Sequence, residues 1–129
     1  MQSNKLVLII DDEPAIAGLL GSAFRVRGHD VVTATNGPDG IARARERRPD
    51  AVVVDLVMPD MDGFRVLEAL RSDATTADVP VLVMSAGFDP TVGPRAHREG
   101  VPFLAKPFDW TRLVHTVEEL LTGERPASA

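Results

Sequence analysis

Five short apolar runs, separated by longer segments of helical period, constrain this chain more than any other feature. The runs are rich in Val, Ile and Leu and occupy residues 5–10, 30–35, 51–55, 80–84 and 101–105. Several of them lack polar alternation, as is typical of strands buried on both faces of a sheet. Strands that alternate with helices build parallel sheets covered by crossover helices. The sequence therefore predicts an α/β fold, a doubly wound five-stranded parallel sheet with helices on both faces.

The first helix is expected over residues 13–27, with Asp12 near its N-cap. Gly18 and Gly21 are expected on its outward side, so packing holds this helix more than propensity does. The inward stripe is predicted to be Ile16, Leu20, Ala23 and Phe24.

Four further helices are expected, over residues 38–48, 63–72, 94–99 and 110–122. The last of them should turn Leu113, Val117, Leu120 and Leu121 inward. The fourth is the weakest, because Pro90, Gly93 and Pro94 interrupt its helical pattern. We therefore expect residues 87–100 to be the least stable segment.

Length and charge limit what the chain can be. With 129 residues and 44% hydrophobic content, it should form one domain with a single core, over residues 1–122, followed by a small polar tail or linker at 123–129. The net charge of -5 argues against direct nucleic-acid binding by this segment. The arginine-rich run at 43–48 also contains Glu46, which favours a solvated helix face.

The composition also bears on the cellular compartment. There is no cysteine, so disulfides and thiolate metal sites are excluded. The first apolar run is too short for a signal-peptide core or a membrane span. We therefore expect a cytoplasmic protein without membrane partners.

Ionisable residues stand directly after the predicted strands. Asp11 and Asp12 follow LVLII, Asp55 follows AVVV, and Lys106 follows VPFLA. The carboxyl ends of parallel strands meet at one edge of a sheet, where open α/β folds bind ligands. Two carboxylates about 4 Å apart repel by roughly 4 kcal/mol at an effective dielectric near 20. The cluster therefore predicts a divalent cation.

Each of these residues also has an ordinary explanation when taken alone. Asp12 could simply cap a helix, Asp55 could close a turn, and Lys106 could be solvated. Ser85, at the end of the fourth strand, could be a strand-end hydroxyl. It is their coincidence at the ends of four different strands that favours a functional site.

Four stretches together resemble a known family. They are LVLIIDDEP, VVVDLVMPDMDGFRVLEALR, VPVLVMSA and FLAKPF, in the order and spacing of the receiver domains of two-component response regulators, from Lys5 to Leu121. The resemblance implies a flavodoxin-like sheet of strand order 2-1-3-4-5. It also implies a signalling module that catalyses only its own phosphorylation and dephosphorylation.

The resemblance assigns the acidic residues. It implies that Asp55 is the phospho-acceptor and that Mg²⁺, or Mn²⁺ as a substitute, is required. Asp12, Asp55 and the backbone carbonyl of Val57 would bind the ion directly, and Asp11 would act mainly through water. These are the oxygen ligands that Mg²⁺ prefers.

The resemblance also assigns the residues around the phosphoryl group. Lys106 and the Ser85 hydroxyl would contact the phosphoryl oxygens. Ser85 and Phe103 would form the conformational switch, although Phe103 is equally well explained as a core residue. Output would pass through the face formed by the fourth helix, the fifth strand and the fifth helix.

The implied partners are a sensor histidine kinase or phosphotransfer protein, and a downstream target or fused output domain. A degenerate receiver that acts as a scaffold independent of phosphorylation is the main alternative. A phosphatase of the haloacid dehalogenase type is disfavoured, because Glu13 and Pro14 stand where its second Asp and Thr are needed. A flavodoxin-like electron carrier is disfavoured because the acids would repel a flavin phosphate.

Overall fold

The structure, a computed structural model, describes residues 5–86, 89–106 and 109–123. Its strands are β1 (Leu6–Ile10), β2 (Asp30–Ala34), β3 (Ala51–Asp55), β4 (Val81–Ala86) and β5 (Phe103–Lys106). Its helices are α1 (Pro14–Val26), α2 (Gly37–Glu46), α3 (Gly63–Arg71), α4 (Val92–Glu99) and α5 (Trp110–Leu121). The strands form one parallel sheet of order β2-β1-β3-β4-β5. The predicted fold class and strand order are therefore confirmed.

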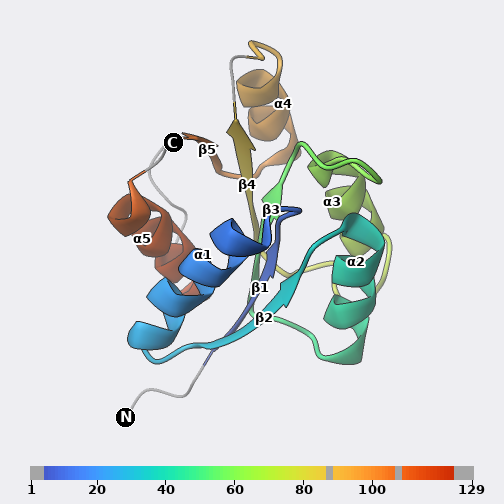
Figure 1. Cartoon of the computed structure of the whole chain (residues 1–129). Helices are drawn as coiled ribbons and strands as arrows, with labels where there is room; N and C mark the ends of the chain where they lie inside the picture. Colours follow the sequence, from blue (N-terminus) through green and yellow to red (C-terminus); the bar gives the residue numbers. More distant parts are fainter. Residues whose placement is uncertain (1–4, 87–88, 107–108, 124–129) are drawn as a thin grey trace.

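Helices cover both faces of the sheet (Figure 1). The sheet divides the interior into two cores, where the sequence predicts a single one, because alternate residues of the central strands point to opposite faces. Val7, Ile9 and Val53 pack towards α1 and α5. Leu8 and Val52 pack towards α2, α3 and α4. This alternation is the period-2 geometry of a strand, and burial of both faces explains why these strands read as continuous apolar runs.

The first helix begins differently from the prediction. Its N-cap is Glu13, which makes no side-chain cap bond, and not Asp12. Gly21, expected outside, is buried, because a glycine there lets Val31 of β2 approach: an added Cβ would lie 3.3 Å from Val31 Cγ1. Gly18 is exposed as predicted. The fully buried stripe is Ala17, Leu20, Gly21 and Phe24, with Ile16 and Ala23 only partly buried.

The fourth helix starts at Val92, two residues before the predicted start at Pro94. A proline is tolerated there because the N–H groups of a first helical turn have no acceptor inside the helix. Asp89 Oδ1 accepts hydrogen bonds from the Thr91 backbone N–H (2.9 Å) and the Thr91 hydroxyl (2.6 Å), which organises the entry to the helix. Residues 87–88 of the segment lie outside the described residues.

Two arginines fasten α4 to α3. The Arg95 guanidinium lies 4.1 Å from the ring centroid of Phe64. Arg71 forms an ion pair of 3.1 Å with Glu99 and donates a second bond of 2.6 Å to the Glu99 carbonyl. These contacts stabilise a helix of weak intrinsic propensity. The expectation that this segment opens before the strands stays a prediction.

The fifth strand begins at Phe103, later than the predicted 101. Gly100 ends α4 in the left-handed region (φ 72°), and the Val101 N–H donates back to the Ala96 carbonyl at 3.0 Å. Val101 therefore completes the helix cap. Pro102 has no N–H with which to join the strand ladder.

The arginines of α2 are largely engaged by aspartates. Arg43 pairs with Asp39, Arg45 with Asp73, and Arg47 with Asp30, at 2.9 to 3.3 Å. The first pair lies within α2, and the other two connect the helix and its C-cap residue Arg47 to neighbouring segments. These exposed pairs agree with the interpretation of this run as a solvated helix face.

The predicted tail, residues 123–129, lies outside the described residues from 124 onwards. Within the described ranges, no helix has the length and apolar character needed to cross a membrane.

A three-residue ion-pair cluster joins α1 to α5 at the sheet edge opposite the acidic residues. Arg27 contacts Glu118 through two nitrogens, each at 2.8 Å, and His29 Nε2 lies 3.0 Å from the same carboxylate. The hydrogen bond from Arg27 is the main reason that the pKa of Glu118 lies below its ordinary value.

We expect Glu118→Gln to lower the free energy of unfolding by about 1 kcal/mol at neutral pH, a modest value because Arg27 is half exposed. A carboxyl whose pKa is depressed on folding stabilises the fold above its unfolded pKa, and this contribution is lost as the pH falls through the folded pKa. The difference between variant and wild type in urea unfolding should therefore shrink below about pH 4.5. A constant difference down to pH 3 would contradict the ion-pair explanation.

Candidate metal and phosphoryl site

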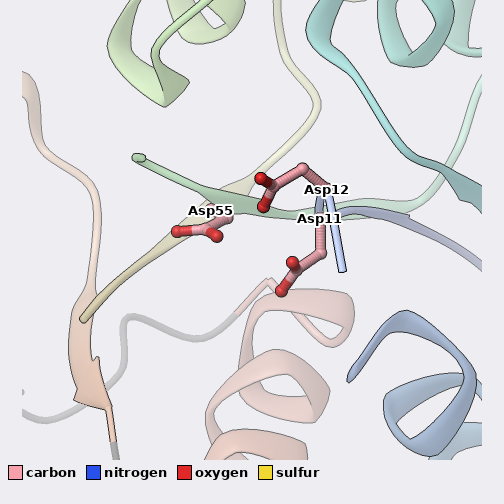
Figure 2. Close-up of side chains that lie close together, drawn as sticks. All are labelled: Asp11, Asp12 and Asp55. Atoms are coloured by element: carbon pink, nitrogen blue, oxygen red, sulfur yellow. The ribbon is translucent and has the colours of Figure 1, made fainter. Parts of the chain in front are cut away.

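Three carboxylates meet at the carboxyl ends of β1 and β3. Asp11, Asp12 and Asp55 each contribute one oxygen to a group in which all the oxygens lie within 4.8 Å of one another. Figure 2 shows Asp11 and Asp12 extending in different directions from consecutive positions, with Asp55 beside them. The predicted clustering is therefore confirmed. It arises because β1 and β3 are neighbours in register, Ile10 opposite Val54.

Backbone N–H groups orient two of these carboxylates. Asp11 Oδ1 accepts the Glu13 N–H at 2.9 Å, and Asp55 Oδ1 accepts the Val57 N–H at 3.2 Å. Both side chains are buried, with exposures of 0% and 3%, whereas Asp12 is partly exposed. The carboxylates are thus held by the turns that follow their own strands, and Asp12 faces the more open side of the cluster.

Gly63 allows the loop after β3 to close tightly. Its N–H donates to the Leu56 carbonyl at 3.1 Å, and an added Cβ would lie 2.8 Å from the Asp55 carbonyl oxygen. That oxygen belongs to the backbone and cannot easily move aside. Asp62 then caps α3 by accepting the Arg65 N–H at 3.0 Å. The glycine of MPDMDG is therefore required sterically beside Asp55.

The cluster fits a small hard cation. Mg²⁺ binds oxygens at about 2.1 Å, so two direct ligands on opposite sides of it are about 4.2 Å apart. The three carboxylate oxygens lie within 4.8 Å of one another, which is slightly more than this ligand separation. Such a spacing suits two directly bound carboxylates and a third that acts through water. Three like charges at such distances repel one another strongly without a cation.

The other predicted site residues lie at the same edge of the sheet. Asp55 pairs in register with Met84, and Ser85, the next residue of β4, is buried (3% exposed). Lys106 ends β5 opposite Ala86. The described part of Lys106 is its backbone, so its predicted contact with a phosphoryl group lies outside what the structure describes.

Phe103, the predicted switch aromatic, is partly buried against the core beneath α2, α3 and α4. This position agrees with its simple explanation as a core residue. Its role in switching stays a prediction.

Comparison with known proteins agrees with this arrangement. The sheet order and the acidic cluster at the carboxyl edge define a doubly wound α/β domain with a candidate cation site. The family profile of the response regulator receiver domain matches residues 7–118. The chain belongs to the response regulator receiver domain family.

Relatives include both stand-alone and larger proteins. The chain is 36% identical to the protein PilH of Pseudomonas aeruginosa over 118 residues, which cover 91% of this chain and 98% of PilH. It is 38% identical to the DNA-binding dual master transcriptional regulator RpaA of Synechocystis, covering 89% of this chain but 48% of RpaA. The chain therefore spans about half the length of such regulators.

Solved structures confirm the fold. The chemotaxis protein CheY4 of Vibrio cholerae superimposes with a TM-score of 0.84 at 27% identity, over 92% of this chain and 99% of CheY4. A response regulator structure from Chloroflexus aurantiacus gives 0.85 at 28% identity, over 93% and 99%. Family membership makes the haloacid dehalogenase and flavodoxin interpretations wrong.

Sequence reasoning missed the contacts beneath the site. Ile10, which directly precedes Asp11, packs against Gly40 of α2. Met61, in the loop after Asp55, packs against Gly37 of the same helix. The available signal was the spacing of Gly37 and Gly40, three residues apart on one helical face.

Proposed function

We propose that this domain accepts a phosphoryl group on Asp55, in a Mg²⁺-dependent reaction, from a histidine kinase or phosphotransfer protein. One observation carries the proposal: a buried Asp55 at the end of the central strand lies within 4.8 Å of two further carboxylates, in a chain of the receiver family. Asp55, rather than Asp11 or Asp12, is assigned as acceptor because it stands between the central strand and the MPDMDG loop.

The transfer is a displacement at phosphorus. A carboxylate oxygen of Asp55 forms a bond to phosphorus while the bond from phosphorus to the donor imidazole nitrogen breaks, and the imidazole keeps the electron pair. The reacting group is a carboxylate oxygen without a proton, so the transfer itself needs no general base. Bound Mg²⁺ would neutralise the charge that accumulates between the carboxylates and the incoming phosphoryl group.

Residues of this chain would hold both ion and phosphoryl group. We assign Asp12, Asp55 and the Val57 carbonyl as direct ligands of Mg²⁺, or of Mn²⁺ in its place, and Asp11 as a ligand through water. The Val57 N–H bond to Asp55 Oδ1 supports this assignment, because it fixes the loop beside the acceptor carboxylate.

Ser85 and Lys106 are assigned to the phosphoryl oxygens. The Ser85 hydroxyl would donate one hydrogen bond, and the Lys106 ammonium would pair with another oxygen as a point charge. In support, Ser85 stands near the carboxyl end of β4, which pairs with β3, and Lys106 ends β5, which pairs with β4. No other catalysis is proposed beyond phosphorylation and dephosphorylation of the domain itself.

The signal would leave through α4, β5 and α5. Ser85 is the penultimate residue of β4, the strand that precedes α4, so a small movement of Ser85 towards the phosphoryl group can bias the position of that helix. The contacts between α3 and α4, made by Arg71 with Glu99 and by Arg95 with Phe64, are the interactions that such a movement has to change. Phe103 of β5 is the proposed second member of the switch.

The receiving partner is a downstream protein or a fused output domain. Relatives of both kinds exist, since PilH is matched over nearly its full length and RpaA over about half. We propose residues 1–122 as the receiver unit, with DNA binding, where it occurs, carried by another segment or protein.

Intact-mass spectrometry tests the function. The wild type is incubated with a small-molecule phosphodonor, with Mg²⁺ or with excess chelator. We expect the mass of one phosphoryl group to appear only with Mg²⁺. Absence of the added mass with Mg²⁺, in a folded protein, would favour the degenerate scaffold instead.

Lys106→Met should bind Mg²⁺ as the wild type does, because an ammonium is not a metal ligand, but should transmit the signal poorly. Without the fixed counter-ion, the phosphoryl charge loses its attraction towards β5. Amide spectra with and without beryllofluoride, a phosphoryl mimic, measure this transmission. Shifts of wild-type size across residues 89–106 in the variant would contradict the assigned role.

A further inference from the structure

Two glycines of α2 lie against the backbone segments that carry the acidic residues. Gly37 and Gly40 are three residues apart, so they share one face of the helix, and both are buried. Gly40 contacts Ile10 at the end of β1, and Gly37 contacts Met61 in the loop after β3. One helical turn thus contacts the strand that leads to Asp11 and Asp12 and the loop that follows Asp55.

The contact of Gly40 with Ile10 leaves no room for a side chain. A Cβ on Gly40 would lie 2.7 Å from Ile10 Cγ1, with Cδ1 closer still and Cγ2 at 3.2 Å. Ile10 is fully buried and β-branched, so it cannot rotate away from all three clashes. An added side chain therefore forces α2 and the end of β1 apart, and it strains the backbone of Ile10, whose next two residues are Asp11 and Asp12.

The contact of Gly37 with Met61 also leaves no room for a side chain, because it involves the Met61 Cβ, which is bonded to the main chain. A Cβ on Gly37 would lie 2.9 Å from Met61 Cβ and 3.0 Å from its Sδ. The flexible end of a methionine can move, but its Cβ moves only with the main chain. Met61 belongs to the loop that begins with Val57, so displacement of Met61 would be passed to the proposed carbonyl ligand.

We propose that Gly37 and Gly40 are positioning residues of the metal site. By carrying no side chain, they let the end of β1 and the loop after β3 close onto α2, which sets the distance between Asp11, Asp12 and the Val57 carbonyl. Binding sites need their ligands held within about 0.5 Å, which makes such support necessary. The inference rests on the proposed Mg²⁺-dependent function.

Glycine-to-alanine variants test the proposal. Gly37→Ala and Gly40→Ala should each raise the Mg²⁺ dissociation constant about tenfold by titration calorimetry, since displacements of about 1 Å have large effects in such sites. The matched control is Gly18→Ala in α1, where an added Cβ meets no atom within 4 Å. It should bind Mg²⁺ as the wild type does and be slightly more stable.

A second readout does not depend on metal. In the absence of Mg²⁺, Gly40→Ala should shift the amide resonances of Asp11 and Asp12, and Gly37→Ala those of Val57 and Met61, while Gly18→Ala shifts neither set. Wild-type Mg²⁺ affinity in both site variants would overturn the proposal. Failure of the wild type itself to bind Mg²⁺ would instead overturn the proposed function, and the amide shifts would still test the positioning.

A further pair of variants covers the case in which alanine at 37 or 40 prevents folding. Ile10→Val removes the Cδ1 atom that packs on Gly40, and Ile9→Val makes the same change on the opposite face of β1, where the residue is equally buried. Ile10→Val should weaken Mg²⁺ binding about threefold and Ile9→Val should not. Equal effects, or none, would show that α2 does not position the site.

Discussion

Asp55→Asn is expected to remain folded and to lose phosphorylation completely. An amide oxygen is a much weaker nucleophile than a carboxylate and cannot form a stable acyl phosphate, so the mass of a phosphoryl group should not appear at any time point. Apo stability should rise by about 1 kcal/mol, because one member of a repelling cluster becomes neutral. Intact-mass spectrometry and thermal melts measure the two effects.

The matched control is Asp60→Asn. Asp60 lies in the same loop, is exposed, and loses the same charge, but it is outside the acidic cluster. It should be phosphorylated as the wild type is. Loss of phosphorylation in both variants would point to the charge of the loop, and persistence of the added mass in Asp55→Asn would refute the acceptor assignment.

Asp12→Ala should weaken Mg²⁺ binding at least about tenfold, a loss of roughly 1.4 kcal/mol or more, because a direct ligand is removed. Without metal, the variant should be more stable than the wild type by about 1 kcal/mol. No cap bond is lost that would offset this gain, since Glu13 and not Asp12 occupies the N-cap. Calorimetric titration and thermal melts without metal measure the two opposite effects.

Glu13→Ala is the control for Asp12→Ala. Glu13 is the adjacent acid, is exposed, and makes no side-chain cap bond, so its removal changes the local charge equally without removing a ligand. It should leave Mg²⁺ affinity within about twofold of the wild type. Equal weakening in both variants would mean that general charge, and not coordination by Asp12, attracts the ion.

The strands and the acidic cluster could be predicted from sequence because both depend on local signals. Apolar β-branched runs such as AVVV are typical of buried strands, and parallel strands bring residues that follow them to one edge. Asp11, Asp12 and Asp55 therefore lie together as predicted. The strand order itself could be anticipated only through the family resemblance.

Features that depend on contacts between distant segments could not be predicted in this way. The apolar spacing of the first helix predicts Gly21 on the outward side, but the small size of this glycine lets β2 approach α1. The helical pattern and Pro94 predict that α4 starts at residue 94, whereas the hydrogen bonds from Thr91 to Asp89 Oδ1 organise an earlier start at Val92. The packing of Ile10 and Met61 against the glycines of α2 likewise becomes visible only in the tertiary structure.

The most direct test of the central claim is to locate the phosphoryl group. Borohydride reduces an aspartyl phosphate to homoserine, with release of phosphate, and leaves unmodified aspartate intact. After phosphorylation with Mg²⁺, reduction and digestion, tandem mass spectrometry should find homoserine at position 55 and aspartate at 11 and 12. Homoserine at 11 or 12, or at no position in a sample that gained the phosphoryl mass, would contradict the assignment of Asp55 as the phospho-acceptor.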